Sequence, residues 1–274
     1  MSATIPEGKF VDVGDDLRVH YHEAGEGPAV VFLHGSGPGA SGYSNFKRNF
    51  PAIAAAGFRA VVPDTLGFGY SSKPTDRKYT IDFMVDGVIG LLDALGIDTC
   101  SLVGNSAGGA MCIRLALRHP ERVSKMVLMA PGGLETRETY MEMAGIKAMI
   151  RAIFGREGLT HESLRRVFEL QLYDPSDIED DVVAERLAIA EAQPQWVIQT
   201  MRIPNQQADL PKITCPVLGF WGTDDQFCPV SGAMKLATGC ADAKVMLVSR
   251  CGHWVMVEHT EMFNRMSIEF LSGP

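Results

Sequence analysis

One serine in this chain has the surroundings of a nucleophile. Ser106 stands in the run Gly-Asn-Ser-Ala-Gly at positions 104–108, after an apolar stretch at 100–103 and before a helix-like stretch at 110–119. The two glycines are needed because side chains there would crowd a sharp turn between a strand and a helix. Such a turn exposes the serine hydroxyl and directs a helix N-terminus at the group it attacks. The pattern predicts nucleophilic catalysis.

An acid and a histidine follow two later apolar runs. The run at 217–221 leads into Asp224 and Asp225, and the run at 245–248 leads to His253. The order serine, aspartate, histidine is typical of the α/β-hydrolase fold and differs from the order in the other common serine hydrolase folds.

A neutral serine hydroxyl is a poor nucleophile, so a base must take its proton. His253 is the candidate for that base, and it would later return the proton to the leaving group. An aspartate would hold the imidazole in the useful tautomer. Asp224 competes for this role, but we favour Asp225, because three residues after Gly222 the loop turns its acid toward the histidine.

Charge that develops on the substrate oxygen requires backbone N–H donors. One predicted donor is the amide of Ala107, and the other is the amide of Ser36 or Gly37 in a glycine-rich loop at 34–40. A phosphate-binding loop is the alternative, but the stretch lacks the Gly-Lys-Ser/Thr ending and the glycine spacing of a dinucleotide site. His34 is interpreted as structural.

Apolar runs that alternate with helical patterns surround these residues. This alternation predicts an α/β protein with a mainly parallel, doubly wound sheet, which binds ligands beyond the carboxyl ends of its strands. The expected strands lie at 17–23, 29–33, 59–63, 100–103, 123–129, 217–221 and 245–248, and the expected helices lie within 45–56 and at 80–95 and 110–119.

The alternation stops in the middle of the chain. Residues 134–209 are helix-rich, with helical patterns at 163–172 and 180–192, and no convincing core strand. We predict that this segment is a helical lid inserted after the sixth strand. The α/β core would then comprise residues 1–133 and 210–274.

Composition excludes several partners. The chain has 274 residues and a net charge of −8, without a long basic run, which argues against nucleic acid or an anionic membrane. We expect no membrane span and no secretory signal, because no long apolar run occurs and no basic segment precedes one. Six scattered cysteines favour free thiols in the cytoplasm. The histidines lack metal-ligand spacing, so we expect neither a metal nor a cofactor.

Several longer motifs are more particular. They are His-Gly-Ser-Gly-Pro-Gly-Ala at 34–40, Ser44-Asn45, Gly104-Asn105-Ser106, Trp-Gly-Thr-Asp-Asp-Gln-Phe at 221–227 and Cys-Gly-His-Trp at 251–254. In these motifs the chain resembles the meta-cleavage product hydrolases, α/β-hydrolases that break carbon–carbon bonds in bacterial aromatic degradation. The resemblance covers the whole chain and is weakest in the lid.

The resemblance implies a substrate and a reaction. The family hydrolyses 2-hydroxy-6-oxo-hexa-2,4-dienoates to 2-hydroxypenta-2,4-dienoate and a carboxylic acid. Carbon is a poor leaving group, so the dienol must first become a keto tautomer that accepts the departing electron pair. Ser106 would then add to the C6 ketone, water would release the acyl group, and His253 would transfer the protons.

The resemblance also implies substrate-binding residues. Arg186 stands where the family has a lid arginine for the carboxylate, and its planar fork suits that task; a solvated helix arginine is the alternative. Asn45 and Asn105 would add polar contacts. Trp254 would pack beside the substrate chain, unless it is simply a core residue. Family members are commonly oligomers, so we expect a dimer or larger.

Two positions depart from the family pattern. Ala107 is small where the family often has a bulky residue, and Gln171 is polar where we expect an apolar one. Both residues bear on the identity of the C6 substituent, and the small side chain of Ala107 predicts a pocket that admits an aryl group.

Two other functions remain: a carboxylesterase, which would not need Arg186, and a non-catalytic ligand-binding protein, which would not turn substrate over.

Overall fold

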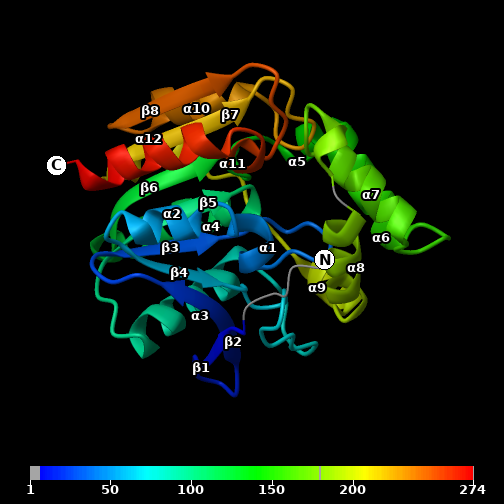
Figure 1. Ribbon diagram of the computed structural model, residues 1–274, viewed down its shortest axis with the longest axis horizontal. Coiled ribbons are helices and arrows are strands. Elements are labelled where there is room, and N and C mark those ends of the chain that lie inside the picture. The colour runs from blue at the N-terminus through cyan, green and yellow to red at the C-terminus, as the bar shows by residue number, and fades with distance from the viewer. Residues whose placement is uncertain (1–6, 179, 274) are drawn as a thin grey trace.

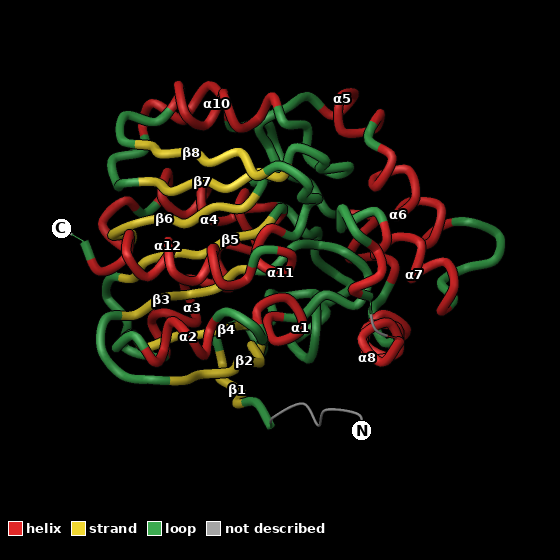
Figure 2. Tube along the Cα trace, turned by 45° about the horizontal axis from the view of Figure 1, so that its top comes forward, coloured by secondary structure: helices red, strands yellow, loops and turns green. Residues whose placement is uncertain are grey.

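A mostly parallel sheet forms the centre of the computed structural model, which describes residues 7–178 and 180–273. Its strands are β1 (Lys9–Asp12), β2 (Arg18–Ala24), β3 (Ala29–Leu33), β4 (Arg59–Pro63), β5 (Cys100–Asn105), β6 (Val123–Met129), β7 (Val217–Gly222) and β8 (Ala243–Val248). The eight strands lie in the order β1-β2-β4-β3-β5-β6-β7-β8. β2 pairs antiparallel with both of its neighbours, and the strands from β4 to β8 in this order pair in parallel. Figure 2 shows the strands side by side in this order.

Helices cover both faces of this sheet (Figure 1). One face packs against α1 (Gly42–Phe46), α2 (Phe50–Ala55), α11 (Val255–Glu258) and α12 (Thr260–Ser272). The other packs against α3 (Ile81–Ala94), α4 (Ala107–Arg118) and α10 (Ser231–Gly239). Because side chains alternate along a strand, Val30 and Phe32 of β3 enter the first layer, and Val31 and Leu33 enter the second. This is why the run 29–33 is apolar throughout.

The predicted doubly wound arrangement is confirmed, and the seven expected strands are present. The helix expected within 45–56 is confirmed as α2, and α1 is a separate short helix that begins before that range. Pro51 occupies the first turn of α2, where its missing N–H is harmless. Inside a continuous helix it would clash with the carbonyl one turn earlier. Strand β1 was not predicted, and it is a short edge strand with little buried surface.

The middle of the chain is helical. It contains α5 (Arg137–Glu142), α6 (Ala144–Phe154), α7 (His161–Glu169), α8 (Asp180–Glu191) and α9 (Gln195–Thr200). Short 3-10 helices lie between α7 and α8 at Pro175–Asp177, before β7 at Gln207–Lys212, and before β6 at Pro120–Arg122. Helices α5 to α9 follow β6 and lie beyond one end of the sheet (Figure 1). In the described part of 134–209 no residue joins the sheet as a named strand. None of the described helices has the length and apolarity needed to cross a bilayer.

Candidate active site

Ser106 lies at the junction of β5 and α4 with a strained backbone. Its φ of 55° and ψ of −117° place a non-glycine residue in a region that side chains rarely adopt. The flanking glycines allow the close packing that this turn requires. A Cβ on Gly108 would lie 1.8 Å from the carbonyl oxygen of Leu33, and one on Gly104 would lie 2.5 Å from the sulfur of Cys112. Helix α4 therefore rests directly on the sheet and presents Ser106 at its N-terminus.

Asp225, rather than Asp224, contacts the histidine. The Nδ1 atom of His253 lies 2.7 Å from Oδ2 of Asp225, and both side chains are buried. The other carboxylate oxygen accepts the backbone N–H groups of Phe227 and Cys228 at 2.7 and 2.9 Å. These contacts fix the carboxylate and assign the Nδ1 proton to His253, which leaves Nε2 as an acceptor. Asp224 accepts a hydrogen bond from its neighbour Thr223 instead.

The loop that carries His253 is attached to the helical segment. The carbonyl oxygen of Gln171, just after α7, accepts the N–H groups of His253 and Trp254 at 2.7 and 3.2 Å. Glu258 bridges the same two segments, because its carboxylate accepts the N–H of Gly252 at 2.6 Å and that of Tyr173 at 2.6 Å. The position of the histidine therefore depends on contacts with residues more than 80 positions earlier in the chain.

Two of the predicted oxyanion donors, Ser36 and Gly37, line the same cavity as Ser106, and the third, Ala107, follows Ser106 in the chain. A Cβ on Gly35 would lie 3.4 Å from Cβ of Ser106, so the glycine-rich loop runs beside the nucleophile. Within the ranges 7–178 and 180–273, the amides of Ser36, Gly37 and Ala107 donate to no backbone or side-chain acceptor. These N–H groups are thus available to a ligand.

His34 braces the glycine-rich loop. Its Nε2 accepts the N–H of Thr65 at 3.0 Å, so its Nδ1 carries the proton and donates to the carbonyl of Gly35 at 2.7 Å. Burial lowers the pKa of His34, which keeps the ring neutral.

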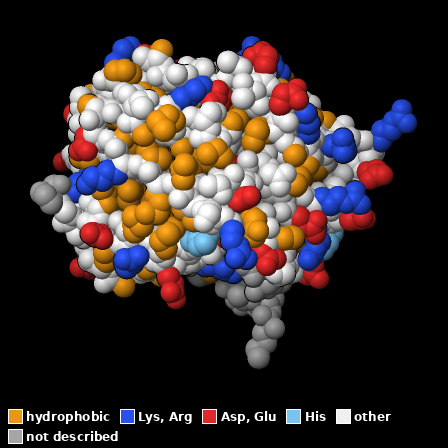
Figure 3. All heavy atoms as spheres, turned by 90° about the horizontal axis from the view of Figure 1, so that it is seen from above, with side chains coloured by type: hydrophobic (Ala, Val, Ile, Leu, Met, Phe, Trp, Pro, Cys, Tyr) orange, Lys and Arg blue, Asp and Glu red, His pale blue; other side chains and the backbone are white. Residues whose placement is uncertain are grey.

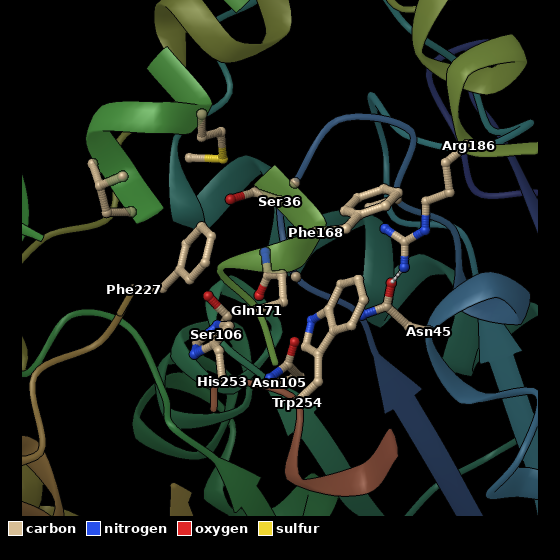
Figure 4. A pocket seen from close by; sticks show the side chains of 15 residues that line it. Ser36, Asn45, Asn105, Ser106, Phe168, Gln171, Arg186, Phe227, His253 and Trp254 are labelled. Atoms are coloured by element: carbon tan, nitrogen blue, oxygen red, sulfur yellow. Dashed lines mark hydrogen bonds between the residues drawn. The ribbon is translucent and has the colours of Figure 1, made fainter. Parts of the chain in front are cut away.

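A cavity of about 50 Å³ opens above Ser106. Figure 4 shows its two ends. Arg186, Asn45, Phe168 and Trp254 form one end. Phe227 lies at the other end and stacks on His253 with ring centroids 5.2 Å apart. Ile146 and Met149 also line the cavity and come from α6, which packs against Phe227, because a Cβ on Gly145 would lie 2.4 Å from that ring. Gln171, Asn105 and Ser36 also line the space between them. The catalytic candidates therefore lie between a polar end and an apolar end.

Arg186 is a buried cation, not a solvated helix arginine. Its side chain lies on α8, and the residue is 3% exposed. Its Nη2 donates to Oδ1 of Asn45 at 2.8 Å, and its guanidinium lies 5.3 Å from the ring centre of Phe168 and 5.1 Å from that of Trp254. Its Nε has no hydrogen-bond partner, and no carboxylate of the described residues forms an ion pair with it. Burial lowers the pKa of Arg186 from 12.5 to about 10, so it stays charged at neutral pH.

Comparison with known proteins gives the family. A family model of the α/β hydrolase fold matches residues 28–260. The 2-hydroxy-6-oxo-6-phenylhexa-2,4-dienoate hydrolase of Burkholderia cepacia is 36% identical, over 97% of this chain and 96% of that protein. This chain belongs to the meta-cleavage product hydrolases of the α/β-hydrolase fold.

Two further members of the family agree with this assignment. The 2-hydroxy-6-oxononadienedioate/2-hydroxy-6-oxononatrienedioate hydrolase of Paraburkholderia xenovorans is 38% identical, over 96% of this chain and 95% of that protein. The solved structure of a meta-cleavage product hydrolase from Pseudomonas fluorescens superimposes with a TM-score of 0.85 at 31% identity, covering 96% of this chain and 97% of that one. The resemblance and the fold class expected from the sequence are confirmed.

Eight of the ten predicted site residues line this cavity. The other two are next to it through their neighbours, because Asp225 contacts His253 and Ala107 follows Ser106 in the chain. Asn105 is buried beside it and donates to the carbonyl of Met129 at 3.4 Å. Sequence reasoning missed the apolar residues Ile146, Met149, Phe168 and Phe227. Phe227 could have been found from its place two residues after Asp225, but the other three lie on helices α6 and α7 without a recognisable motif.

Proposed function

We propose that this enzyme hydrolyses the C5–C6 bond of 2-hydroxy-6-oxo-6-substituted-hexa-2,4-dienoates, the class of compound for which its relatives are named as hydrolases. The observation that carries the proposal is the buried cation of Arg186, which no described carboxylate pairs with, at one end of a cavity that holds Ser106. A buried charge without a counter-ion is costly, and a substrate carboxylate would supply that counter-ion through a bidentate contact. Asn45 and Asn105 would bind the same end, and Trp254 would pack along the conjugated chain.

The reaction begins with a proton shift. The 2-hydroxyl loses its proton and C5 gains one, which gives the 2,6-dioxo tautomer. The proton of Ser106 then passes to Nε2 of His253 as Oγ adds to the C6 ketone, and Asp225 stabilises the imidazolium. The N–H groups of Ala107 and of Ser36 or Gly37 stabilise the oxyanion.

Cleavage follows from this tetrahedral intermediate. The C5–C6 bond breaks, and its electron pair moves through C4 and C3 onto the 2-oxo oxygen. A proton from His253 completes 2-hydroxypenta-2,4-dienoate, and the C6 acyl group stays on Ser106 as an ester. Water then attacks the ester carbonyl, His253 takes one water proton and returns it to Oγ, and the carboxylic acid leaves. The reaction consumes one water and needs no metal or cofactor.

The apolar end of the cavity favours an uncharged C6 substituent. Ile146, Met149 and Phe227 offer no counter-ion, and the cation that lines the described cavity, Arg186, belongs to the opposite end. A second carboxylate, as in a nonadienedioate, would be buried there without a partner. Ala107 follows Ser106 directly, and a small side chain there would leave more room near the scissile bond than a bulky one, so we propose an aryl group at C6.

The experiment that tests this proposal measures the loss of absorbance of the coloured dienolate of 2-hydroxy-6-oxo-6-phenylhexa-2,4-dienoate. We expect the wild type to bleach it with stoichiometric release of benzoate, and Ser106→Ala to release none. Bleaching of the 6-methyl analogue alone would refute the aryl assignment. Hydrolysis of simple esters without cleavage of either dienoate would instead indicate a carboxylesterase, and stoichiometric binding without turnover would indicate a ligand-binding protein.

We also propose that residues 134–209 act as a lid over residues 1–133 and 210–274, and that the enzyme works in the cytoplasm as a homo-oligomer. Strand β8 supports the homo-oligomer, because it is the last strand of the sheet and one of its edges pairs with no other described strand. Met234 and Leu247 nearby are exposed, and Figure 3 shows apolar side chains gathered on the face that carries β8 and α12. Sedimentation of the purified enzyme at micromolar concentration tests this, and a monomer would refute it.

A further inference from the structure

Gln171 places an unsatisfied polar group in the cavity. The residue is 5% exposed and lines the cavity, and its Oε1 has no hydrogen-bond partner among residues 7–178 and 180–273. A buried amide oxygen without a donor destabilises the folded protein, so its presence requires a ligand or another compensation. An apolar residue of similar size would fill the same space without that cost.

The backbone fixes this side chain next to the histidine. The carbonyl of Gln171 accepts the N–H of His253 at 2.7 Å and that of Trp254 at 3.2 Å. A Cβ on Gly252 would lie 2.4 Å from the same carbonyl oxygen, so the two segments are in direct contact. Figure 4 shows the Gln171 amide between Ser106 and Trp254, on the path from the nucleophile to Arg186.

The missing partner must be a hydrogen-bond donor near the reacting carbon. In the substrate of the proposed reaction, the enol hydroxyl is adjacent to the carboxylate and so belongs near Arg186. The keto tautomer has no O–H group, and an unsubstituted aryl group has none either. The remaining donor is the water that hydrolyses the acyl-enzyme, which must lie beside His253.

We propose that Oε1 of Gln171 accepts a hydrogen bond from this hydrolytic water. The inference rests on the proposed function. One water proton points to Nε2 of His253 and the other to Oε1 of Gln171, which directs an oxygen lone pair at the ester carbon on Ser106. The water oxygen bonds to that carbon, His253 takes the first proton, the C–Oγ bond breaks, and the proton passes to Oγ. Gln171 orients the water and exchanges no proton.

Gln171→Met tests this role, because methionine has a similar length and lacks the acceptor. We expect the rate of ester hydrolysis on Ser106 to fall about 10- to 100-fold, while formation of the dienoate product in a single turnover changes less than about threefold. Rapid mixing with the phenyl substrate would then show a burst of dienoate product. Intact-mass measurement would show the enzyme carrying one benzoyl group. Gln171→Glu keeps an acceptor, and above the pKa of its carboxyl group it is expected to restore most of the hydrolysis rate.

Gln206→Met is the matched control. Gln206 is also buried with an unpartnered Oε1, but its Nε2 donates to the carbonyl of Ala110 at 3.1 Å and it does not line the described cavity. We expect this variant to show no burst. Gln171→Leu provides a second variant, should Gln171→Met fold poorly by circular dichroism.

Two results would overturn the inference. The first is a folded Gln171→Met or Gln171→Leu enzyme without a burst and with unchanged turnover. The second is an equal slowing of dienoate formation and ester hydrolysis, because that would make Gln171 a general contact of the substrate chain. Failure of the wild type to cleave the dienoate would be a separate result that refutes the proposed function itself.

Discussion

Replacement of Arg186 by methionine should lower the activity of the enzyme strongly and change its thermal stability little. The guanidinium is buried without a counter-ion in the part of the chain that the structure describes, and burial lowers its pKa from 12.5 to about 10. At about 1.36 kcal/mol per pKa unit, this lowering corresponds to about 3 kcal/mol by which the buried charge destabilises the fold. The variant loses the contacts of the guanidinium with two aromatic rings and Asn45, which together contribute about 3 kcal/mol. The two effects nearly cancel, so we expect the melting temperature to change by less than about 3 °C.

Activity should respond very differently. Removing one partner of a buried, hydrogen-bonded charge pair costs at least about 2 kcal/mol, and we take about 3 kcal/mol for the substrate carboxylate. That energy corresponds to a loss of about 100-fold in kcat/KM for the phenyl dienoate. Arg186→Lys retains the charge without the planar fork, so it should lose only about tenfold.

The assay measures dienolate bleaching beside thermal unfolding. Hydrolysis of p-nitrophenyl acetate, which has no carboxylate for Arg186, serves as the control and should change less than about threefold. The reasoning would be refuted by a kcat/KM for the dienoate that stays within threefold of wild type. A fall of more than about 10 °C in melting temperature would instead make Arg186 a structural residue.

Three further predictions use the same preparations. Ser106→Gly relieves a φ of 55° and should raise the free energy of unfolding by about 1 kcal/mol while abolishing cleavage; urea unfolding that shows no gain would contradict the strain argument. Burial alone would raise the pKa of Asp64, but hydrogen bonds from His20 and backbone amides outweigh it and hold that pKa below 3.8. The ionised Asp64 carboxylate therefore stabilises the fold fully above about pH 4 to 5, and this stabilisation is lost as the pH falls through the folded-state pKa. We expect Asp64→Asn to be less stable than wild type at pH 7, and the two free energies of unfolding to converge toward about pH 2. A difference between them that stays constant with pH would exclude this explanation. Ala107→Met should lower kcat/KM at least tenfold for the phenyl substrate and much less for the methyl analogue, and full activity on the phenyl substrate would refute a roomy acyl pocket.

Much of the fold and the nucleophile could be predicted because their determinants are local. Glycines at 104 and 108 around Ser106, an apolar run before it and a helical stretch after it describe a strand, a tight turn and a helix within about twenty residues. The apolar run 29–33 similarly indicates a strand covered on both faces. Each of these patterns depends on backbone geometry and burial within one or two elements, and neither depends on where distant elements pack.

Only the tertiary structure decided which residues from distant segments of the chain contact each other. Asp224 and Asp225 have the same side chain, and only the packing of the His253 loop shows that Asp225 is the partner. The α8 helix has no marked apolar face, so its sequence alone leaves Arg186 either solvated or buried. Its burial arises because the glycine loop packs against α8, where a Cβ on Gly39 would lie 1.9 Å from the carbonyl oxygen of Arg186. A pocket wall made of residues more than 140 positions apart, such as Asn45 and Arg186, exists only once the whole chain has packed, because each side chain is placed by its neighbours in space.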